Sequence, residues 1–146
     1  MMFGRPANDE RKLGEDECVT HQRISSGSPF EPTIGFSRAV RAGPWIAVAG
    51  TAPIAADGTA AFPGDVYAQT RLCLEIMLRA IAEAGGSAAQ VIRTRIMLVD
   101  IATWRDAARA HGEVFAEVRP ACTFVEVSGL IDPGWLVETE ADAYAA

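Results

Sequence analysis

The end of the chain contains two stretches in which apolar and polar residues alternate, and this pattern constrains the fold more than any other feature. One face of residues 119–128 carries Cys122, Phe124, Glu126 and Ser128. One face of residues 136–143 carries Leu136, Glu138, Glu140 and Asp142. A period of two is typical of β-strands, and Asp132-Pro133-Gly134 supplies a turn between them. We therefore predict a β-hairpin whose common face holds four carboxylates and one thiol.

The length and charge of the chain exclude several classes of protein. At 146 residues with 49% apolar composition, the chain is expected to form one domain with a substantial core. A net charge of −6 argues against a surface for phosphate backbones, so no nucleic-acid partner is expected. No apolar run approaches the roughly 20 residues of a membrane helix, and the polar start does not resemble a secretory signal. We expect a cytoplasmic protein with no membrane partner.

The cysteines are odd in number and lack the spacing of metal ligands. Cys18, Cys73 and Cys122 are therefore expected to be free thiols, and with only two histidines no metal site is predicted. Residues 1–20 are too polar to pack and are predicted to be a flexible tail. The folded domain is predicted to span residues 21–146.

Four further strands and two helices are predicted before the terminal stretches. The strands fall at residues 22–26, 35–41, 45–50 and 91–100, and in the last of these Ile92, Ile96 and Leu98 are expected to share one face. The first helix, residues 65–84, begins at an Asp65 N-cap and ends before Gly85. The second, residues 103–117, is capped by Thr103. This order predicts an α+β fold in which a mixed sheet of about five or six strands carries both helices on one face.

The other face of the sheet is expected to be buried against a partner. If the alternations are in phase, it carries Arg93, Arg95, Cys122, Glu126, Glu138 and Glu140 together with Met97, Phe124 and Leu136. Apolar side chains among the charges favour an oligomer, and pairing of arginines with carboxylates would offset the desolvation cost.

From about Ile24 to Ala143 the chain resembles the Rid family of reactive intermediate deaminases, also called the YjgF or endoribonuclease L-PSP family. The resemblance rests on Gly35-Phe36-Ser37-Arg38-Ala39-Val40 (similar to GPYSQAV), Val48-Ala49-Gly50-Thr51 (similar to VSGQ), Asp65 with Gln69-Thr70, residues 91–100, Arg119-Pro120-Ala121 and residues 137–141. It implies a chorismate-mutase-like domain in a homotrimer with its sheets facing inward. It also implies clefts between subunits that bind a small metabolite without a metal or cofactor.

The resemblance assigns roles to two residues of the terminal stretches. In deaminases of the family, an arginine clamps the carboxylate of a 2-imino or 2-enamino acid and a glutamate orients the hydrolytic water. The arginine position falls on Cys122 and the glutamate position on Glu138. A thiol cannot form two charge-assisted bonds to a carboxylate, so the standard 2-imino acid deaminase activity is not expected.

The same comparison identifies the remaining candidate residues of the cleft. They are Phe36 at a tyrosine position, Ala49 at a serine position, Gly50 and Thr51 as backbone that holds an oxygen, Arg109 near an asparagine position, and Phe124 at a cysteine position. The predicted function is a divergent Rid hydrolase in which Glu138 orients water at an imine, enamine or related carbon. The alternative is a non-catalytic trimeric module that binds or senses a small molecule. A ribonuclease is disfavoured by the acidic charge.

Three candidate residues keep a structural interpretation beside the functional one. Glu138 is either a general base or an interfacial ion-pair partner of Arg93 or Arg95. Cys122 is more simply a small residue in an interfacial strand than a nucleophile, because no histidine is obviously placed to activate it. His111 lies on the apolar stripe of the second helix, where a core role is the simpler interpretation.

Overall fold

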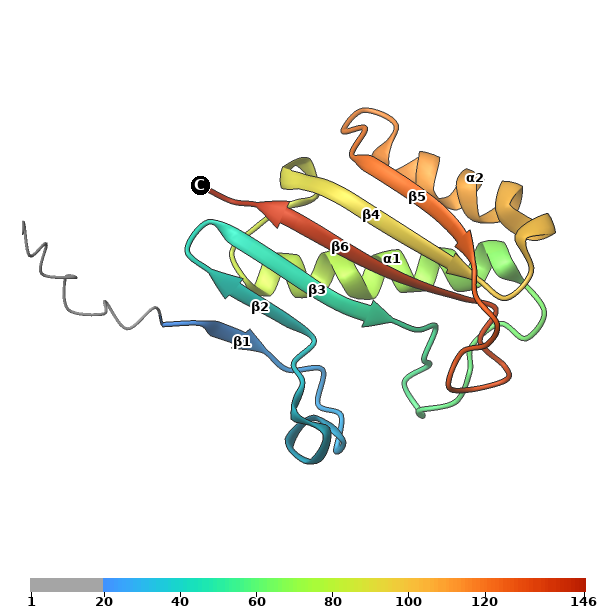
Figure 1. Cartoon of the computed structure of the whole chain (residues 1–146), viewed down its shortest axis with the longest axis horizontal. Coiled ribbons are helices and arrows are strands. Elements are labelled where there is room, and N and C mark those ends of the chain that lie inside the picture. The colour runs from blue at the N-terminus through green and yellow to red at the C-terminus, as the bar shows by residue number, and fades with distance from the viewer. Residues whose placement is uncertain (1–19) are drawn as a thin grey trace, which may run out of the picture.

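The structure is a computed structural model that describes residues 20–146, so the predicted tail and Cys18 lie outside the described residues, apart from Thr20. Six strands and two long helices follow in the order β1 (Gln22–Ile24), β2 (Ala39–Ala42), β3 (Trp45–Thr51), α1 (Val66–Glu83), β4 (Val91–Leu98), α2 (Trp104–Phe115), β5 (Ala121–Glu126) and β6 (Val137–Tyr144). Three short helical turns, η1 (Glu31–Gly35), η2 (Ala88–Gln90) and η3 (Ile101–Thr103), lie between them. Figure 1 shows this arrangement.

The strands form one sheet in the order β1-β2-β3-β6-β4-β5, and both long helices lie against one of its faces (Figure 1). All neighbouring strands are antiparallel except β4 and β5, which are parallel. The predicted α+β fold with a mixed sheet and two helices on one face is therefore confirmed. Because both helices cover the same face, the opposite face is uncovered in a single chain.

The core between helices and sheet follows the predicted periodicities. Asp65 caps α1 as predicted, since its side chain accepts a hydrogen bond from the backbone N–H of Ala68 at 2.9 Å. The helix buries Cys73, Leu74, Met77 and Ile81, all with no exposed surface. From the sheet, residues that alternate with exposed ones face these side chains: Ile46, Val48, Ile96, Leu98, Val137, Ala141 and Ala143.

The predicted terminal hairpin is wrong, because β5 and β6 are not neighbours. Strand β4 lies between them, antiparallel to β6 and parallel to β5. Helix α2 connects β4 to β5, and such a crossover is the usual connection between parallel strands. Alternation and an intervening turn identified two strands correctly but did not identify their partners.

The predicted common face of these strands is wrong for the same reason. In the parallel register Thr94 lies beside Cys122 and Ile96 beside Phe124, and cross-strand neighbours share a face. Since Thr94 and Ile96 are fully buried under the helices, Cys122 and Phe124 also face the helical layer. The side chains of β5 on the uncovered face are those of Ala121, Thr123 and Val125.

Two smaller predictions are also wrong. A bulge between Val91 and Arg93 shifts the alternation of β4, so that Val91 is buried and Ile92 is 42% exposed. Thr103 occupies the N-cap position of α2, but its hydroxyl makes no capping hydrogen bond and instead donates to the carbonyl of Asp100 at 2.7 Å.

The uncovered face carries the predicted pairing of arginines with carboxylates. Arg95 lies 3.3 Å from Glu140 and 3.8 Å from Asp142, while Arg93 lies 3.7 Å from Asp142. All four side chains remain partly exposed, so each pair contributes little to the stability of a single chain. Within residues 20–146, no helix combines the length and apolarity needed to cross a membrane.

Gln69 of α1 contacts two long loops at one end of the sheet, residues 52–65 and 127–136. Its side chain is fully buried, and its amide donates to the carbonyls of Ala61 and Gly134, both at 2.9 Å. Its oxygen accepts from the N–H of Leu136 at 2.8 Å. The buried amide of Gln69 therefore provides hydrogen-bond partners for loop N–H and C=O groups that have no partner in the sheet.

We expect Gln69→Leu to lower the free energy of unfolding by about 3–5 kcal/mol, because the loop groups lose their partners while staying buried. Urea unfolding followed by tryptophan fluorescence measures the change. The matched control is Gln22→Leu, which removes an exposed amide and should change the free energy of unfolding by less than about 0.5 kcal/mol. Equal stability of the two variants would contradict this role for Gln69.

Candidate functional site

Glu138 lies in β6 next to a gap in the neighbouring strand β3. A Cβ atom built on Gly50 would overlap the Oε1 atom of Glu138, so the carboxylate occupies space that only glycine leaves open. The pairing of β3 with β6 is irregular between Val48 and Thr51, and Gly50 lies within this bulge. Bulges that bring backbone and a side chain close together are common beside active sites.

Arg38, directly before β2, holds this bulge in place by hydrogen bonds. Its Nη1 donates hydrogen bonds to the carbonyl of Gly50 at 2.5 Å and to the Thr51 hydroxyl at 3.2 Å. The Thr51 hydroxyl donates in turn to the carbonyl of Ala49 at 2.9 Å. Nε of Arg38 is buried without a hydrogen-bond partner among the described residues. The Ala49-Gly50-Thr51 segment is therefore held in place by a half-buried cation.

The protonation of Glu138 is determined by burial more than by its charged neighbours. Burial raises the pKa of the carboxyl group, the Arg38 guanidinium opposes this shift, and Glu140 adds to it. A carboxylate with a raised pKa accepts a proton more readily than an exposed one, which suits a general base. No ion pair joins Glu138 to Arg93 or Arg95, because those arginines lie near Glu140 and Asp142.

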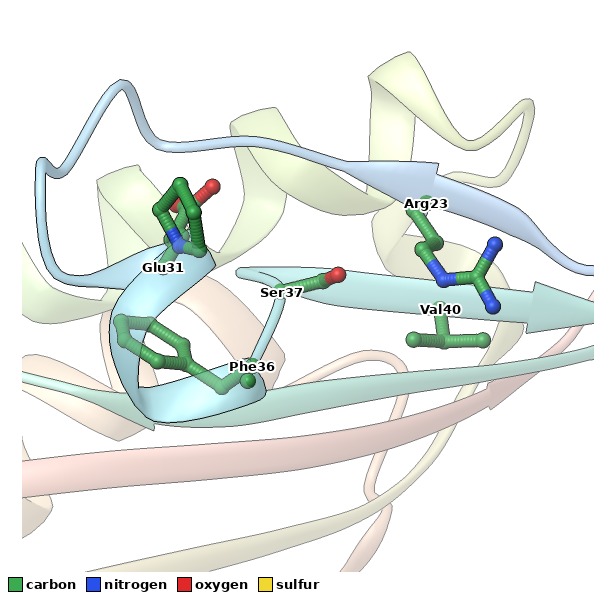
Figure 2. Close-up of a pocket in the computed structure, with 7 residues that line it drawn as sticks. Arg23, Glu31, Phe36, Ser37 and Val40 are labelled. Atoms are coloured by element: carbon green, nitrogen blue, oxygen red, sulfur yellow. The ribbon is translucent and has the colours of Figure 1, made fainter.

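A hollow of about 420 Å³ lies over β1, β2 and the η1 turn (Figure 2). Phe36, Ser37 and Val40 line it, with Arg23 and Glu31 at its margins. Arg23 and Val40 are paired in register and point away from the helices, so the hollow opens on the uncovered face. Among the predicted cleft residues, only Phe36 lines this hollow.

A second group of candidate residues surrounds Cys122 on the helix side of the sheet. Cys122 is exposed and lies beside Thr94 in the parallel register of β4 and β5. Nε2 of His111 lies 2.8 Å from the Thr94 hydroxyl. Phe124 lies edge-on to both Trp104 and His111, with ring centroids 6.2 and 6.3 Å apart.

The expectation that no histidine is placed to activate Cys122 stays a prediction, since the hydrogen-bond partner of His111 is Thr94. Thr94, which sequence analysis did not single out, forms a hydrogen bond with His111 and is the neighbour of Cys122 in register. The sequence does contain a threonine at a position of β4 that faces the helices. That it lies beside Cys122 follows only from the parallel pairing of β4 with β5. Burial lowers the pKa of His111, and burial raises the pKa of Cys122 while the Thr94 hydroxyl lowers it.

Arg109 lies away from this group, on the outside of the helical layer. Its guanidinium stacks 3.7 Å from the ring centroid of Tyr67, and it lies 4.0 Å from Asp106. It is His111, two residues along α2, that faces the strand carrying Cys122.

Apart from Arg109, the candidate residues of one chain form two separate groups, which we call half-sites. The first consists of Ala49, Gly50, Thr51 and Glu138, with Arg38 beside them and Phe36 in the adjoining hollow. The second consists of Cys122 and Phe124, with Thr94 and His111. Glu138, Met97 and Val125 lie in register across the uncovered face, whereas Cys122 is on the helix side, so no single chain brings Cys122 to Glu138. In residues 20–146, no group of three His, Cys, Asp or Glu side chains is arranged to hold a metal ion.

Comparison with known proteins shows which family has this architecture. The family model described as Endoribonuclease L-PSP matches residues 27–145. An uncharacterized protein from Streptomyces coelicolor is 42% identical over 123 residues, covering 84% of this chain and 91% of its own length. A 3-aminoacrylate deaminase, RutC, from Acinetobacter baylyi is 32% identical over 121 residues, covering 83% of this chain and 94% of its own length.

A solved structure extends the match to three dimensions. Rv2704 from Mycobacterium tuberculosis, described as a member of the highly conserved YjgF/YER057c/UK114 family, is 45% identical with a TM-score of 0.77. The alignment covers 86% of this chain and 100% of that one. Sequence model, relatives and fold agree, and the chain belongs to the Rid/YjgF (endoribonuclease L-PSP) family.

Proposed function

We propose that this protein is a divergent Rid-family hydrolase that adds water to a small imine, enamine or related electrophile. The observation that carries this proposal is the Glu138 carboxylate, half-buried with a raised pKa against the open backbone at Gly50. Glu138 accepts a proton from water as the oxygen bonds to the imine carbon, with an enamine reacting as its imine tautomer, and it then returns this proton to the nitrogen. The C–N bond breaks as the hydroxyl of the adduct becomes a carbonyl, its proton goes to the nitrogen, and ammonia leaves. The backbone at Gly50 and Thr51 is proposed to hold the substrate's oxygen. No metal or cofactor is required for this step.

The substrate is proposed to be less acidic than a 2-imino acid. A relative of this chain is a 3-aminoacrylate deaminase, so hydrolysis at an enamine carbon occurs in a protein of similar sequence. That substrate class carries a carboxylate, whereas Cys122 stands at the position of the family's arginine clamp. Arg93 and Arg95 lie near carboxylates on the other face of the sheet. An uncharged or differently held substrate therefore fits this chain better.

A homotrimer is proposed because each chain contains the site only in halves. A second copy packed against the uncovered face would bring one chain's Cys122 region toward the other chain's Glu138. That face carries Met97 and the 40%-exposed Val125 among its paired charges, a mixture suited to an interface.

The alternative function is a trimeric module that binds a small molecule without converting it. The hollow lined by Phe36 favours this alternative, because it offers an apolar floor between Arg23 and Glu31 at its margins. A ribonuclease is disfavoured by the net charge of −6, and no nucleic-acid partner is proposed.

We expect the protein to release ammonia from 2-iminobutyrate or 2-aminoacrylate at least about 100-fold more slowly than an arginine-containing family deaminase, because a bidentate charged contact is missing. Cys122→Arg should raise this activity, while Cys122→Ser, which adds no charge, should not. Activity of the unmodified chain near that of the family deaminases would contradict the argument from Cys122.

We expect Glu138→Gln to lower ammonia release from 2-iminobutyrate by about 100-fold or more, both in the unmodified chain and in the Cys122→Arg variant. Since the pKa of Glu138 is raised, the activity should be lost as pH falls through a value above the ordinary glutamate pKa of about 4.3. The ionised form is the one that burial disfavours, so Glu138→Gln should not lower the melting temperature at pH 7. A variant that melts normally and retains full activity would exclude Glu138 as the base.

We expect light scattering to give about three times the 15.5 kDa mass of the chain at micromolar concentration. Val125→Lys should dissociate the assembly, because it places an unpaired charge in the proposed interface. Ile101→Lys, at a side chain that is equally exposed but lies outside the uncovered sheet face, is the control and should not. A monomeric unmodified chain would refute the shared cleft.

A further inference from the structure

We propose that Arg38 is the positioning residue for hydrolysis at Glu138: by holding the Gly50 carbonyl and the Thr51 hydroxyl, it fixes the backbone against which the Glu138 carboxylate lies. The consequences for turnover rest on the proposed function, which this inference deepens by naming the residue that controls where the base lies and down to which pH it acts. Arg38 does not contact the substrate in this role, since it acts through Gly50 and Thr51.

A series of direct contacts leads from Arg38 to Glu138. Nη1 of Arg38 donates to the Gly50 carbonyl at 2.5 Å and to the Thr51 hydroxyl at 3.2 Å. Gly50 in turn leaves open the space that Oε1 of Glu138 fills, because a Cβ atom built on this glycine would overlap that oxygen. Strand β3 lies between β2 and β6, so Arg38 holds Gly50 from the side away from Glu138. A shift of Gly50 toward β6 would displace the carboxylate, and Arg38 opposes that shift.

The strand pairing does not by itself fix this segment. The register of β2 with β3 ends at Val48, and the register of β3 with β6 is irregular between Val48 and Thr51. The backbone N–H of Ala49 donates to the carbonyl of Arg38 at 2.9 Å, but the Gly50 carbonyl accepts from the Arg38 side chain. The position of Gly50 therefore depends on this side chain more than on the sheet.

The burial of Arg38 has a cost that its own hydrogen bonds do not offset completely. Nε is buried and has no hydrogen-bond partner within residues 20–146. Burial lowers the pKa of Arg38, while Glu31 and Glu138 raise it. A guanidinium keeps its proton in proteins, so Arg38 is a half-buried cation. A buried donor without a partner lowers stability and calls for an explanation, which a positioning role provides.

The charge of Arg38 adds a second effect to its hydrogen bonds. The side chains around Glu138 come from four parts of the chain: Arg38 before β2, Glu140 on β6, Met97 in register on β4, and Cys73 on α1. Met97 is uncharged, burial keeps the Cys73 thiol neutral by raising its pKa, and Glu140 lies 3.3 Å from Arg95. Arg38 is thus the cation that opposes the effect of burial on the pKa of Glu138. Removing its charge should raise this pKa further, so that the base is lost at a higher pH.

Three substitutions separate the charge of Arg38 from its hydrogen bonds. Arg38→Lys keeps a charged donor, Arg38→Gln keeps a donor without the charge, and Arg38→Met removes both. The backbone hydrogen bond from Ala49 to residue 38 remains in every variant, so the strand pairing is retained. Arg79→Gln is the control, because it removes an exposed arginine of α1 whose partner is Glu75.

Ammonia release from 2-iminobutyrate, with uncatalysed hydrolysis subtracted at each pH, measures the effect on turnover. On the pH-independent plateau, Arg38→Met should lower kcat by about tenfold or more and change KM by less than about threefold, because the base is misplaced while substrate binding is not. Arg38→Lys and Arg38→Gln should keep kcat within about threefold of the original. The acid limb of the profile should move to higher pH in Arg38→Gln and Arg38→Met but not in Arg38→Lys or Arg79→Gln.

Carbon-13 NMR of the Glu138 carboxyl group, assigned with Glu138→Gln, tests the charge effect without any substrate. The titration midpoint should lie at higher pH in Arg38→Gln and Arg38→Met than in the original chain and Arg38→Lys. A merely structural role would lower the melting temperature or kcat without moving this midpoint.

Equal midpoints in the original chain and in folded Arg38→Gln would overturn the proposal, and so would an unchanged kcat in folded Arg38→Met. If Arg38→Met does not fold, the comparison of Arg38→Gln with Arg38→Lys decides the question. Full activity of Glu138→Gln would instead refute the proposed hydrolase, and the NMR midpoints would still show whether Arg38 acts on Glu138.

Discussion

The pairing of β4 with β6 on one side and with β5 on the other determines which side chains each face of the sheet presents. The antiparallel pairing places Arg95 beside Glu140 and Met97 beside Glu138, which gives the uncovered face its mixture of ion pairs and apolar groups. The parallel pairing places Thr94 beside Cys122 and directs both toward α2. Because side chains alternate along a strand, a shift of one residue in either register would exchange the two faces. Both candidate half-sites depend on this single strand.

The pKa of Glu138 depends on burial and on the charge of the nearby Arg38. Arg38 is half-buried, donates to backbone and hydroxyl oxygens around Gly50, and lies close enough to Glu138 to oppose the effect of burial on its pKa. Removing a carboxylate from water is costly, so a nearby cation keeps its ionised form accessible. Burial and the arginine thus have opposite effects on the pKa of Glu138, and burial is the larger one. Arg38 also holds the bulge of β3 by hydrogen bonds to Gly50 and Thr51. One residue therefore affects both the pKa of Glu138 and the backbone conformation beside it.

The half-site at Cys122 shows a different balance. Thr94, the neighbour of Cys122 in register, is fully buried and lies 2.8 Å from Nε2 of His111, whose ring lies beside the rings of Phe115 and Phe124. In such surroundings the neutral forms of the histidine and the thiol are favoured. The two half-sites therefore combine a carboxylate near a cation with a thiol beside an uncharged threonine. If subunits bring the halves together, one cleft contains both environments.

The sequence alone determined the elements that depend on local periodicity and on single-residue signals. The alternation in residues 136–143, the apolar stripe of α1, its Asp65 cap and the glycine stop after it are all found in the structure, because each reflects forces between residues near in sequence. Ordered motifs also identified the family, and they named Glu138 and Gly50 as residues of one cleft. What the sequence could not determine was which strands are neighbours. Strand partners depend on the packing of α2 against the sheet, and this packing separated β5 from β6.

The consequences of that packing were decided only in the tertiary structure. Cys122 and Phe124 face the helices rather than Glu138, because they lie in register with Thr94 and Ile96 of β4, which face the helices. Their own alternation does not show which face this is. Ile92 is exposed because a bulge, which leaves no local signature, shifts the pattern by one residue. His111 gained a polar partner only when two strands and a helix were assembled around Thr94. Local sequence thus determines which elements form, and long-range pairing determines which of their side chains meet.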